Sequence, residues 1–143
     1  MTIAALIKAR EGIEPITVTL GRRVGDVVSL LAEQKIGAVP VMDGDQVAGI
    51  MSERDVITRL ARDGAAVLDA PVEEIMTAPA ITVECDKTVL SALSLMTSRR
   101  IRHLPVVENG KLISLVSIGD LVKYRLDKIE AEAEAMLSYI QTA

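Results

Sequence analysis

Residues 36–55 read IGAVPVMDGDQVAGIMSERD, and residues 101–120 read IRHLPVVENGKLISLVSIGD. The two stretches align without a gap at an offset of 65 positions, which places Asp55 on Asp120. The same offset matches Thr17 with Thr82, Val24 with Val89, Pro40 with Pro105 and Ser52 with Ser117. The chain is therefore an internal duplication of one small unit. Such a unit usually cannot bury its apolar face alone, so we expect the two copies to pack on each other and to line the cleft between them twice.

The first copy, which spans 16–57, follows the pattern strand, helix, strand, strand, helix. Its predicted elements are a strand at 16–18, a helix with apolar residues at helical spacing over 24–31, strands at 37–42 and 47–51, and a helix at 53–63. An Asp43-Gly44 turn joins the two longer strands, as is typical of a β-hairpin. The near-continuous apolar character of these strands indicates that both of their faces are covered.

The second copy, over 81–122, repeats this order. Its predicted elements are a helix from 89, strands at 103–107 and 112–116 joined by an Asn109-Gly110 turn, and a helix from 118 that continues towards 140. The later part of this last helix is acidic, and its apolar residues lie along one side. They are Leu126, Ile129, Ala133, Met136, Leu137 and Ile140. We interpret the segment as a packing or dimer-contact element.

These elements predict a mixed α/β (α+β) fold of two β-α-β-β-α repeats, packed as a pseudo-two-fold pair with an extra helix at each end. The predicted boundaries are a lead-in with a short helix at 1–12, a first repeat at 13–66, a connector at 67–78, a second repeat at 79–125 and an acidic helix at 126–143. The residue pattern by itself assigns no chemistry to the lead-in or to the connector.

Composition argues against several classes of protein. A chain of 143 residues that is 50% hydrophobic can bury a core, yet its apolar runs are far shorter than the roughly 20 residues of a membrane helix. No stretch has the layout of a signal peptide, so we expect a cytoplasmic protein without membrane contact. The formal net charge of -4 and the absence of Phe and Trp argue against nucleic-acid binding.

The chemistry-bearing residues are few. The single cysteine, Cys85, cannot form an internal disulfide, and together with the single histidine, His103, it cannot supply a four-ligand metal site. We interpret Cys85 as a buried small residue. No serine or cysteine has an identifiable base partner, and no glycine-rich phosphate loop is present, so we expect no enzyme activity.

Ser52 and Ser117 each follow the last strand of a copy and precede a helix, and an aspartate stands three residues later in both copies. An ordinary helix start prefers these residues, because the hydroxyl satisfies free N–H groups and the carboxylate suits the positive end of the helix dipole. The same arrangement can bind a nucleotide, since the helix start can receive a phosphate and the aspartate can accept hydrogen bonds from a ribose diol. Both interpretations are open for Asp55 and Asp120, and the repetition of the pattern favours the second.

Together these motifs strongly resemble the cystathionine-beta-synthase (CBS) domain family in its tandem arrangement, the Bateman module, of the stand-alone bacterial type. The resemblance covers about 13–122 and depends on the strands IGAVPV and IRHLPV, the turns GIMSERD and VSIGD, and the connector VEEIMT. It implies ligand clefts between the copies, each with Ser and Asp from one copy and base-facing strands from the other. The implied ligand is an adenine nucleotide, most simply AMP, with ATP, ADP, NAD(H) and S-adenosylmethionine as open alternatives.

Carried over position by position, the resemblance implies two ligand sites. The first comprises Ile50, Ser52, Arg54, Asp55, Thr77, Ile81, Ile101, Arg102, His103 and Pro105. The second comprises Ile16, Ile36, Gly37, Ala38, Pro40, Leu115, Ser117, Gly119 and Asp120. In both, isoleucine and proline side chains would form apolar walls for a purine, and the aspartate would bind the ribose.

The two predicted sites differ in charge. Arg54, Arg102 and His103 surround the first, whereas the matching positions of the second hold glycine and alanine. A phosphate-rich ligand should prefer the first site, where cations make charge-assisted hydrogen bonds and a phosphate would favour the charged form of His103. The second site is open to a less charged adenosine compound, to a Lys or Arg from a partner chain, or to no ligand. We interpret Arg99 and Arg100 as solvated residues that close a helix.

We therefore predict a regulatory sensor that binds an adenine nucleotide between the copies and passes a change in their packing to a partner protein. Because the sequence contains no catalytic or transport domain beside the two copies, we expect the effector to be another chain. The resemblance also implies a homodimer in which four repeats form a flat disc. The alternative is a constitutive homodimeric scaffold that has no physiological ligand.

Overall fold

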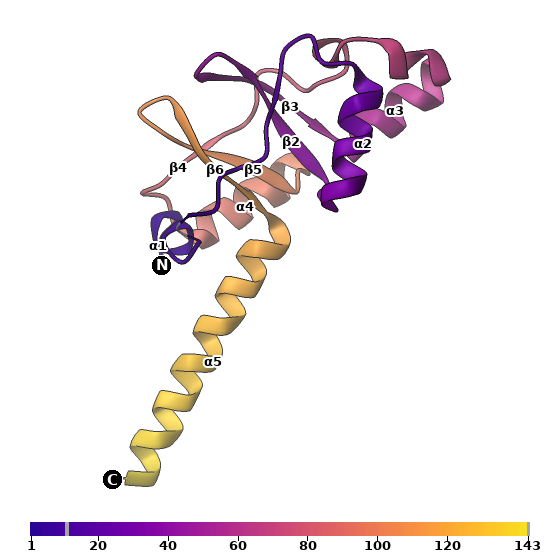
Figure 1. Ribbon diagram of the computed structural model, residues 1–143. Coiled ribbons are helices and arrows are strands. Elements are labelled where there is room, and N and C mark those ends of the chain that lie inside the picture. The colour runs from indigo at the N-terminus through magenta and orange to yellow at the C-terminus, as the bar shows by residue number, and fades with distance from the viewer. Residues whose placement is uncertain (11, 143) are drawn as a thin grey trace.

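The computed structural model describes residues 1–10 and 12–142, over which the chain forms two three-stranded sheets with helices packed around them. The strand orders are β1-β2-β3 and β4-β5-β6, so each copy of the duplicated sequence builds one sheet. β3 and β6 contact each other where the copies meet, and α5 extends from the second copy to the C-terminus (Figure 1). The predicted mixed fold of two repeats is confirmed.

The two copies have the same topology. The first consists of β1 (Val18–Thr19), α2 (Val24–Gln34), β2 (Ala38–Asp43), β3 (Gln46–Ser52) and α3 (Glu53–Asp63), followed by the short 3-10 helices η1 (Ala65–Asp69) and η2 (Val72–Glu74). The second consists of β4 (Val83–Glu84), α4 (Val89–Arg99), β5 (His103–Glu108), β6 (Lys111–Ser117) and α5 (Ile118–Thr142), and α1 (Ile3–Lys8) precedes both. In each sheet the first strand pairs in parallel with the second, and the second and third form an antiparallel hairpin.

Hairpin turns and strand ends follow the local sequence with two exceptions. Gly44 has a φ of 60° at the first position of its two-residue loop, and Asn109 and Gly110 have φ values of 52° and 79° at both positions of theirs, as the favoured two-residue hairpin loops require. The Asn109-Gly110 turn is confirmed, whereas the first turn lies one residue later than predicted, at Gly44-Asp45, because Asp43 still pairs with Gln46. The strand expected at 16–18 is wrong in extent, because pairing with β2 involves only Val18 and Thr19.

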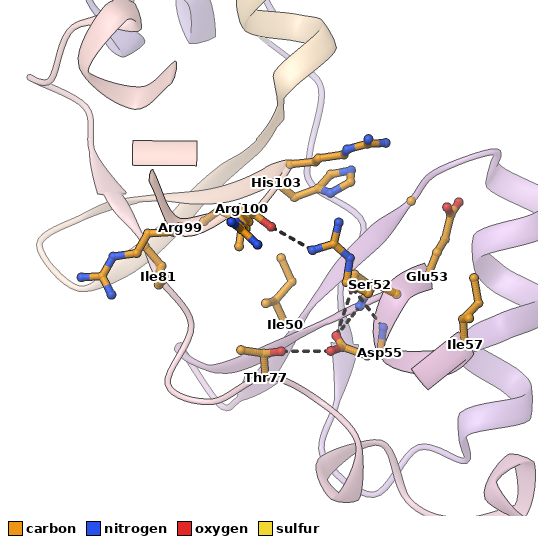
Figure 2. Close-up of a pocket in the computed structure, with 14 residues that line it drawn as sticks. Ile50, Ser52, Glu53, Asp55, Ile57, Thr77, Ile81, Arg99, Arg100 and His103 are labelled. Carbon is orange, nitrogen blue, oxygen red and sulfur yellow. Dashed lines mark hydrogen bonds between the residues drawn. The ribbon is translucent and has the colours of Figure 1, made fainter. Parts of the chain in front are cut away.

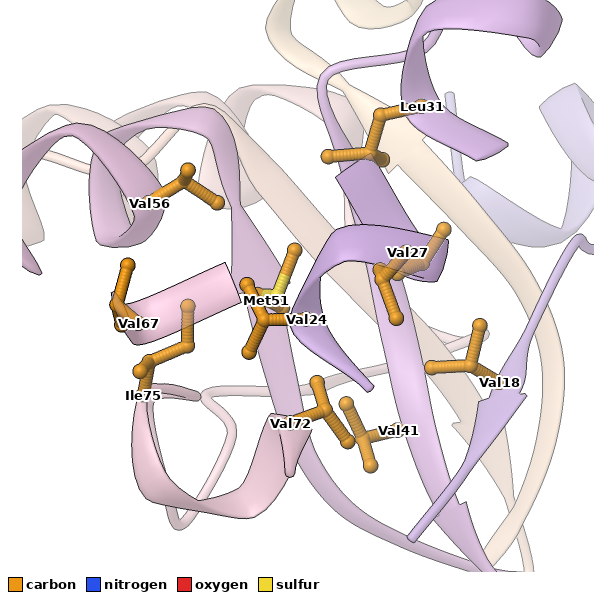
Figure 3. Packing of buried hydrophobic residues seen from close by; sticks show 11 residues of the cluster. Val18, Val24, Val27, Leu31, Val41, Met51, Val56, Val67, Val72 and Ile75 are labelled. Atoms are coloured by element: carbon orange, nitrogen blue, oxygen red, sulfur yellow. The ribbon is translucent and has the colours of Figure 1, made fainter. Parts of the chain in front are cut away.

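Each copy has its own hydrophobic core. The first contains Val24, Val27 and Leu31 of α2 at helical spacing, together with Met51 of β3 and Val72 of η2 (Figure 3). The equivalent face of α4 packs against the sheet of the second copy. Because β2 and β5 are buried over most of their length, their sequences are apolar on both faces, as predicted.

The segment that precedes each copy packs into the core of the other copy. Ile3 and Leu6 of α1 are buried in the core of the second copy, far along the sequence. Val72 and Ile75, which lead into the second copy, are buried in the core of the first. The chain therefore passes between the copies twice, and these two crossings bring lead-in and connector residues to the clefts described below.

α5 contains 25 residues and leaves the body after its first turns (Figure 1). Leu121 is fully buried and Tyr124 packs partly against the second core, whereas Leu126 is 54% exposed and Ile129 is 44% exposed. The predicted helix from 118 towards 140 is confirmed. Its later part is not a packing element within the described chain, and its role as a dimer contact stays a prediction. Among the described residues, no helix is both long enough and apolar enough to cross a membrane.

Candidate functional site

A cleft of about 610 Å³ lies between the copies, where β3 and the start of α3 face the end of α4 and the start of β5 (Figure 2). We call it the first cleft. Its lining residues are Gly37, Ile50, Ser52, Glu53, Arg54, Asp55, Ile57, Thr77, Ile81, Arg99, Arg100, Ile101, Arg102 and His103. Both copies and the connector contribute to this surface, and its volume suits a small-molecule ligand.

Asp55 serves the helix start and the first cleft at once. Its Oδ2 accepts hydrogen bonds from the Ser52 N–H at 2.8 Å and from the Ser52 hydroxyl at 3.1 Å. The Asp55 N–H in turn donates to Ser52 Oγ at 3.3 Å, and this bond and that from the Ser52 N–H form a capping box at the start of α3. Its other oxygen, Oδ1, accepts a hydrogen bond from Thr77 Oγ1 at 3.0 Å. Capping therefore occupies one carboxylate oxygen and leaves the other beside Thr77, which also lines the cleft.

Backbone pairing holds Thr77 in place. The Ile50 N–H donates to the Thr77 carbonyl at 3.0 Å, and the Thr77 N–H donates to the Ile50 carbonyl at 2.8 Å. The connector approaches β3 closely here, because a Cβ on Gly49 would lie 2.7 Å from the Thr77 carbonyl oxygen and 2.8 Å from Met76 Sδ. Glycine at position 49 therefore permits the contact that brings Thr77 to Asp55.

The wall of the first cleft that belongs to the second copy is basic. α4 ends at Arg99, and Arg100 follows in the left-handed conformation with a φ of 55°. Arg54 Nη1 donates to the Arg100 carbonyl at 2.9 Å, so a side chain of the first copy reaches the second copy across the cleft (Figure 2). Arg99 and Arg100 close the helix as predicted, but they also line the cleft with Arg102, which the sequence interpretation missed. Four arginines therefore line this cleft, and their positive charge suits an anionic ligand.

His103 lies at the junction of the two copies. A Cβ on Gly37 would be 3.0 Å from its Cε1 and 3.2 Å from its Nε2, so the imidazole packs on the backbone of the first copy. Burial holds the pKa of His103 below its ordinary value, while the charges of Glu53 and Asp120 oppose that shift and Arg102 adds to it. In the absence of a ligand, the neutral imidazole is thus favoured.

The structure brings together most of the residues predicted for the first site. Ile50, Ser52, Arg54, Asp55, Thr77, Ile81, Ile101, Arg102 and His103 all line the first cleft. The exception is Pro105, which lies in the buried centre of β5, pairs with Leu115 and is not among the lining residues. Gly37 was expected in the second site, but it lines the first cleft. Glu53 and Ile57 also line the cleft and carried no signal in the sequence.

At the second copy, Asp120 repeats the geometry of Asp55 but has a different partner. Its Oδ2 accepts a hydrogen bond from the Ser117 N–H at 2.8 Å, and the Asp120 N–H donates to Ser117 Oγ at 3.1 Å. Arg10 of the lead-in contacts the same carboxylate through Nη2 at 2.9 Å and donates through Nη1 to the Leu115 carbonyl at 3.3 Å. In the first copy, Thr77 contacts the Asp55 carboxylate and the Ile50 carbonyl. Arg10 contacts the two equivalent groups of the second copy.

Apart from Gly37, the other residues predicted for the second site line neither the first cleft nor the cavity at the hairpin tips, so their role as a ligand site stays a prediction. Ala38 and Pro40 are buried within β2, and Ile36 packs against the first core. Ile16 lies on the surface, 36% exposed. A second cavity of about 530 Å³ lies near the hairpin tips, and none of its lining residues belongs to this predicted set.

The duplicated positions show that positive charge gathers at one cleft. The residues that match Arg54, Arg99, Arg100, Arg102 and His103 at the offset of 65 are Gly119, Gln34, Lys35, Gly37 and Ala38. The two copies therefore differ: arginines line the cleft beside Asp55, whereas the matching carboxylate, Asp120, forms an ion pair with Arg10.

The family follows from both the duplication and the sequence match. Residues 10–62 and 72–127 match the family model of the CBS domain. The chain belongs to the CBS domain family. Each matched segment contains one of the two copies, so the protein is a tandem CBS pair.

Sequence relatives include longer CBS proteins. The chain is 37% identical over 123 residues to the mitochondrial CBS domain-containing protein CBSX3 of Arabidopsis thaliana, covering 82% of this chain and 60% of that protein. It is 32% identical to CBSCBSPB2 of the same plant, of which it covers 22%. The chain therefore spans about three fifths and about one fifth of these two relatives.

Solved structures of CBS-domain proteins share the fold over most of the chain. A putative signal-transduction protein from Burkholderia ambifaria is 43% identical, with a TM-score of 0.83 over 89% of this chain and 95% of that chain. ATU1752 from Agrobacterium tumefaciens is 37% identical, with a TM-score of 0.82 over 87% and 99%. PAE2072 from Pyrobaculum aerophilum, which was solved complexed with AMP, is 27% identical, with a TM-score of 0.73 over 84% and 89%.

Proposed function

We propose that this CBS pair is a regulatory module that binds an adenine nucleotide, most simply AMP, in the first cleft and signals its presence to a separate partner protein. The observation that carries the proposal is the Asp55 carboxylate, fixed by the Ser52 cap and by Thr77 on one side of a cleft whose other side carries arginines. The AMP complex of the structural relative PAE2072 supports the same ligand class.

Each part of a nucleotide has a matching group in the first cleft. Asp55 would accept hydrogen bonds from the ribose diol, because an ionised carboxylate only accepts and has lone pairs beyond those used by the cap. Ile50, Ile81 and Ile101 would enclose the purine between the copies. The phosphate would lie against Arg102 and the neighbouring guanidinium groups, where charge-assisted hydrogen bonds are strongest. ADP, ATP, NAD(H) and S-adenosylmethionine share the adenosine part and remain alternatives.

The cleft also contains a contact that can carry a signal. Arg54 of the first copy donates to the Arg100 carbonyl of the second. A bound phosphate would compete for the Arg54 guanidinium and so favour a different spacing of the copies. A ligand shifts such an equilibrium only by its difference in affinity for the two arrangements, and a charged ligand beside a movable cation provides that difference.

We further propose that one nucleotide binds per chain, because the carboxylate of the second copy is already paired with Arg10. The proposal assigns no catalytic step to either cleft. A homodimer that places four repeats in a flat disc, and an effector on another chain, remain part of the proposal as implied by the family.

The alternative is a homodimeric scaffold without a physiological ligand, which the exposed apolar side of α5 favours. Hydrogen exchange with and without AMP separates the two functions. A sensor should show ligand-dependent protection at 50–56 and at 99–103, with little change at the matching turn over 115–121. Unchanged exchange in all three segments at millimolar AMP, and with each alternative ligand, would favour the scaffold.

A further inference from the structure

The part of α5 beyond the body carries an unpartnered apolar stripe. Val122, Leu126 and Ile129 are 42%, 54% and 44% exposed, and Met136 and Ile140 are 66% and 63% exposed. Scattered exposed apolar residues are ordinary, but a row of them along one helix is not. Covering this stripe is unrelated to filling the first cleft, so it goes beyond the proposed function.

The stripe has the spacing of a coiled coil. Its members are Val122, Leu126, Ile129, Ala133, Met136 and Ile140, which alternate steps of four and three residues. These steps place them at the a and d positions of a heptad repeat, with Leu126, Ala133 and Ile140 at a. The segment is about 28 Å long at about 1.5 Å per residue. A strict period of seven favours a second helix as the partner, because two helices then keep one seam in contact along their length.

The body of the chain leaves this seam free. Leu121 and Tyr124, which anchor α5 to the second core, occupy the c and f positions. These positions lie on the helix side opposite to a and d. The same helix can therefore dock on its own body through Leu121 and Tyr124 and leave the stripe exposed along the part that extends from the body (Figure 1).

Charges beside the seam favour a second molecule of this chain as the partner and favour a parallel direction of the two helices. In a parallel pair, Arg125 at g faces the partner's Glu130 at e, and symmetry makes this favourable contact twice. In an antiparallel pair with full overlap, Glu130 would face the partner's Glu130 and Glu132 would face the partner's Glu132. Like charges at these places oppose pairing. The flanking glutamates also disfavour an anionic lipid surface as the occupant.

We propose that residues 122–140 of α5 form a parallel two-stranded coiled coil with the same segment of a second copy of this chain. In each of the two molecules the first cleft lies on the body, away from this seam, so nucleotide binding and pairing of α5 are separable by mutation.

A disulfide test reads both contact and direction. In a Cys85→Ser background, Met136→Cys places one thiol at d, where the helices of the two molecules meet in a parallel coiled coil. In the antiparallel arrangement the two thiols would be about 15 Å apart. Ser138→Cys, at the outward f position, is the matched control. We expect mild oxidation to cross-link the full-length Met136→Cys protein and not the control, whereas equal cross-linking of both, or of neither, would overturn the proposal.

Sedimentation equilibrium gives an independent measurement. Ile129→Glu adds one charge to the seam, and Ala131→Glu adds the same charge at an outward position of the same helix. Contacts between the bodies and between the α5 segments would add to each other, so we expect Ile129→Glu to weaken self-association at least tenfold and to abolish the Met136→Cys cross-link, with nucleotide binding retained. Ala131→Glu should change neither. Equal self-association of the two variants would overturn the proposal, because α5 would then not contribute to the contact between two molecules of this chain.

Discussion

The guanidinium of Arg10 lies 2.9 Å from the carboxylate of Asp120, where the first copy has a threonine hydroxyl against Asp55. Arg10 and Thr77, the two partners of these carboxylates, come from the segments that precede the copies rather than from the copies themselves. An ion pair that needs no ligand thus stands where the other cleft presents a neutral donor. This difference, together with the arginines of the first cleft, makes two similar folds chemically unequal.

Replacing Arg10 should expose the second carboxylate. In Arg10→Ala we expect adenosine to gain a second, weaker binding event, because Asp120 becomes available to a ribose while the cations needed for a phosphate are absent there. The pair is about one-third exposed on both sides, so its loss should cost less than about 1 kcal/mol of stability. Calorimetry with adenosine measures the stoichiometry, and Lys8→Ala is the control for lost positive charge. An unchanged stoichiometry would show that Arg10 does not block the cleft.

Arg102 should contribute to phosphate affinity and not to recognition of adenosine. We expect Arg102→Gln to weaken AMP binding about tenfold, which is about 1.4 kcal/mol, and to leave adenosine binding unchanged. The salt dependence of AMP affinity should also decrease, since fewer charges take part. Arg62→Gln removes a guanidinium from the outer side of α3, where it pairs with Asp63, and serves as the control. Equal losses for AMP and adenosine would contradict a phosphate contact.

The single histidine makes a pH-dependent stability prediction. Because the pKa of His103 is lowered in the fold, the unfolded chain binds more protons just below pH 6.5, and stability should rise as pH increases through that window. Carboxylates titrate mainly near pH 4, so between pH 5.5 and about 7 the effect belongs to His103. Urea denaturation across this range measures the slope, and His103→Gln should flatten it. A wild-type slope equal to that of the variant would contradict burial as the cause.

Gly49 should be intolerant of a side chain. A Cβ there would lie 2.7 Å from the Thr77 carbonyl oxygen, a backbone atom that can move only with the connector. We expect Gly49→Ala to cost about 1–3 kcal/mol of stability and to weaken AMP binding as Thr77 moves away from Asp55. Chemical denaturation and calorimetry measure the two effects. Gly119→Ala is the control, because its nearest neighbour, Ser117 Oγ, would be 3.6 Å away. Equal behaviour of the two variants would exclude the close approach.

The fold was predictable from sequence because the duplication repeats most of the local signals. The apolar spacing of α2 and α4 and the Ser-Asp helix starts occur twice at one offset, so each copy supports the interpretation of the other. The turn glycines, Gly44 and Gly110, differ by one position in this alignment but mark a hairpin in both copies. The limits of β1 were not predictable, since β-branched residues favour extended backbone whether or not a neighbouring strand pairs with them.

The candidate site was predictable where its residues sit on repeated motifs, and not elsewhere. Arg10 and Asp120 are far apart in the chain, and no local pattern connects the lead-in with the second copy. Arg99 and Arg100 were interpreted as helix-end residues, because only the packing of the two copies places the end of α4 at the first cleft. Pro105 was expected there by position, but β5 keeps it in the buried part of the strand.

The central claim is that Asp55, and not Asp120, binds a nucleotide. Calorimetric titration of AMP into nucleotide-free protein tests it, with Asp55→Asn and Asp120→Asn compared under identical conditions. Both variants alter the same capping contact, so both should lose a similar stability of about 1 kcal/mol. We predict about one AMP per chain, at least tenfold weaker binding in Asp55→Asn and unchanged binding in Asp120→Asn. Equal affinities in all three proteins, or no binding by the folded wild type, would contradict it.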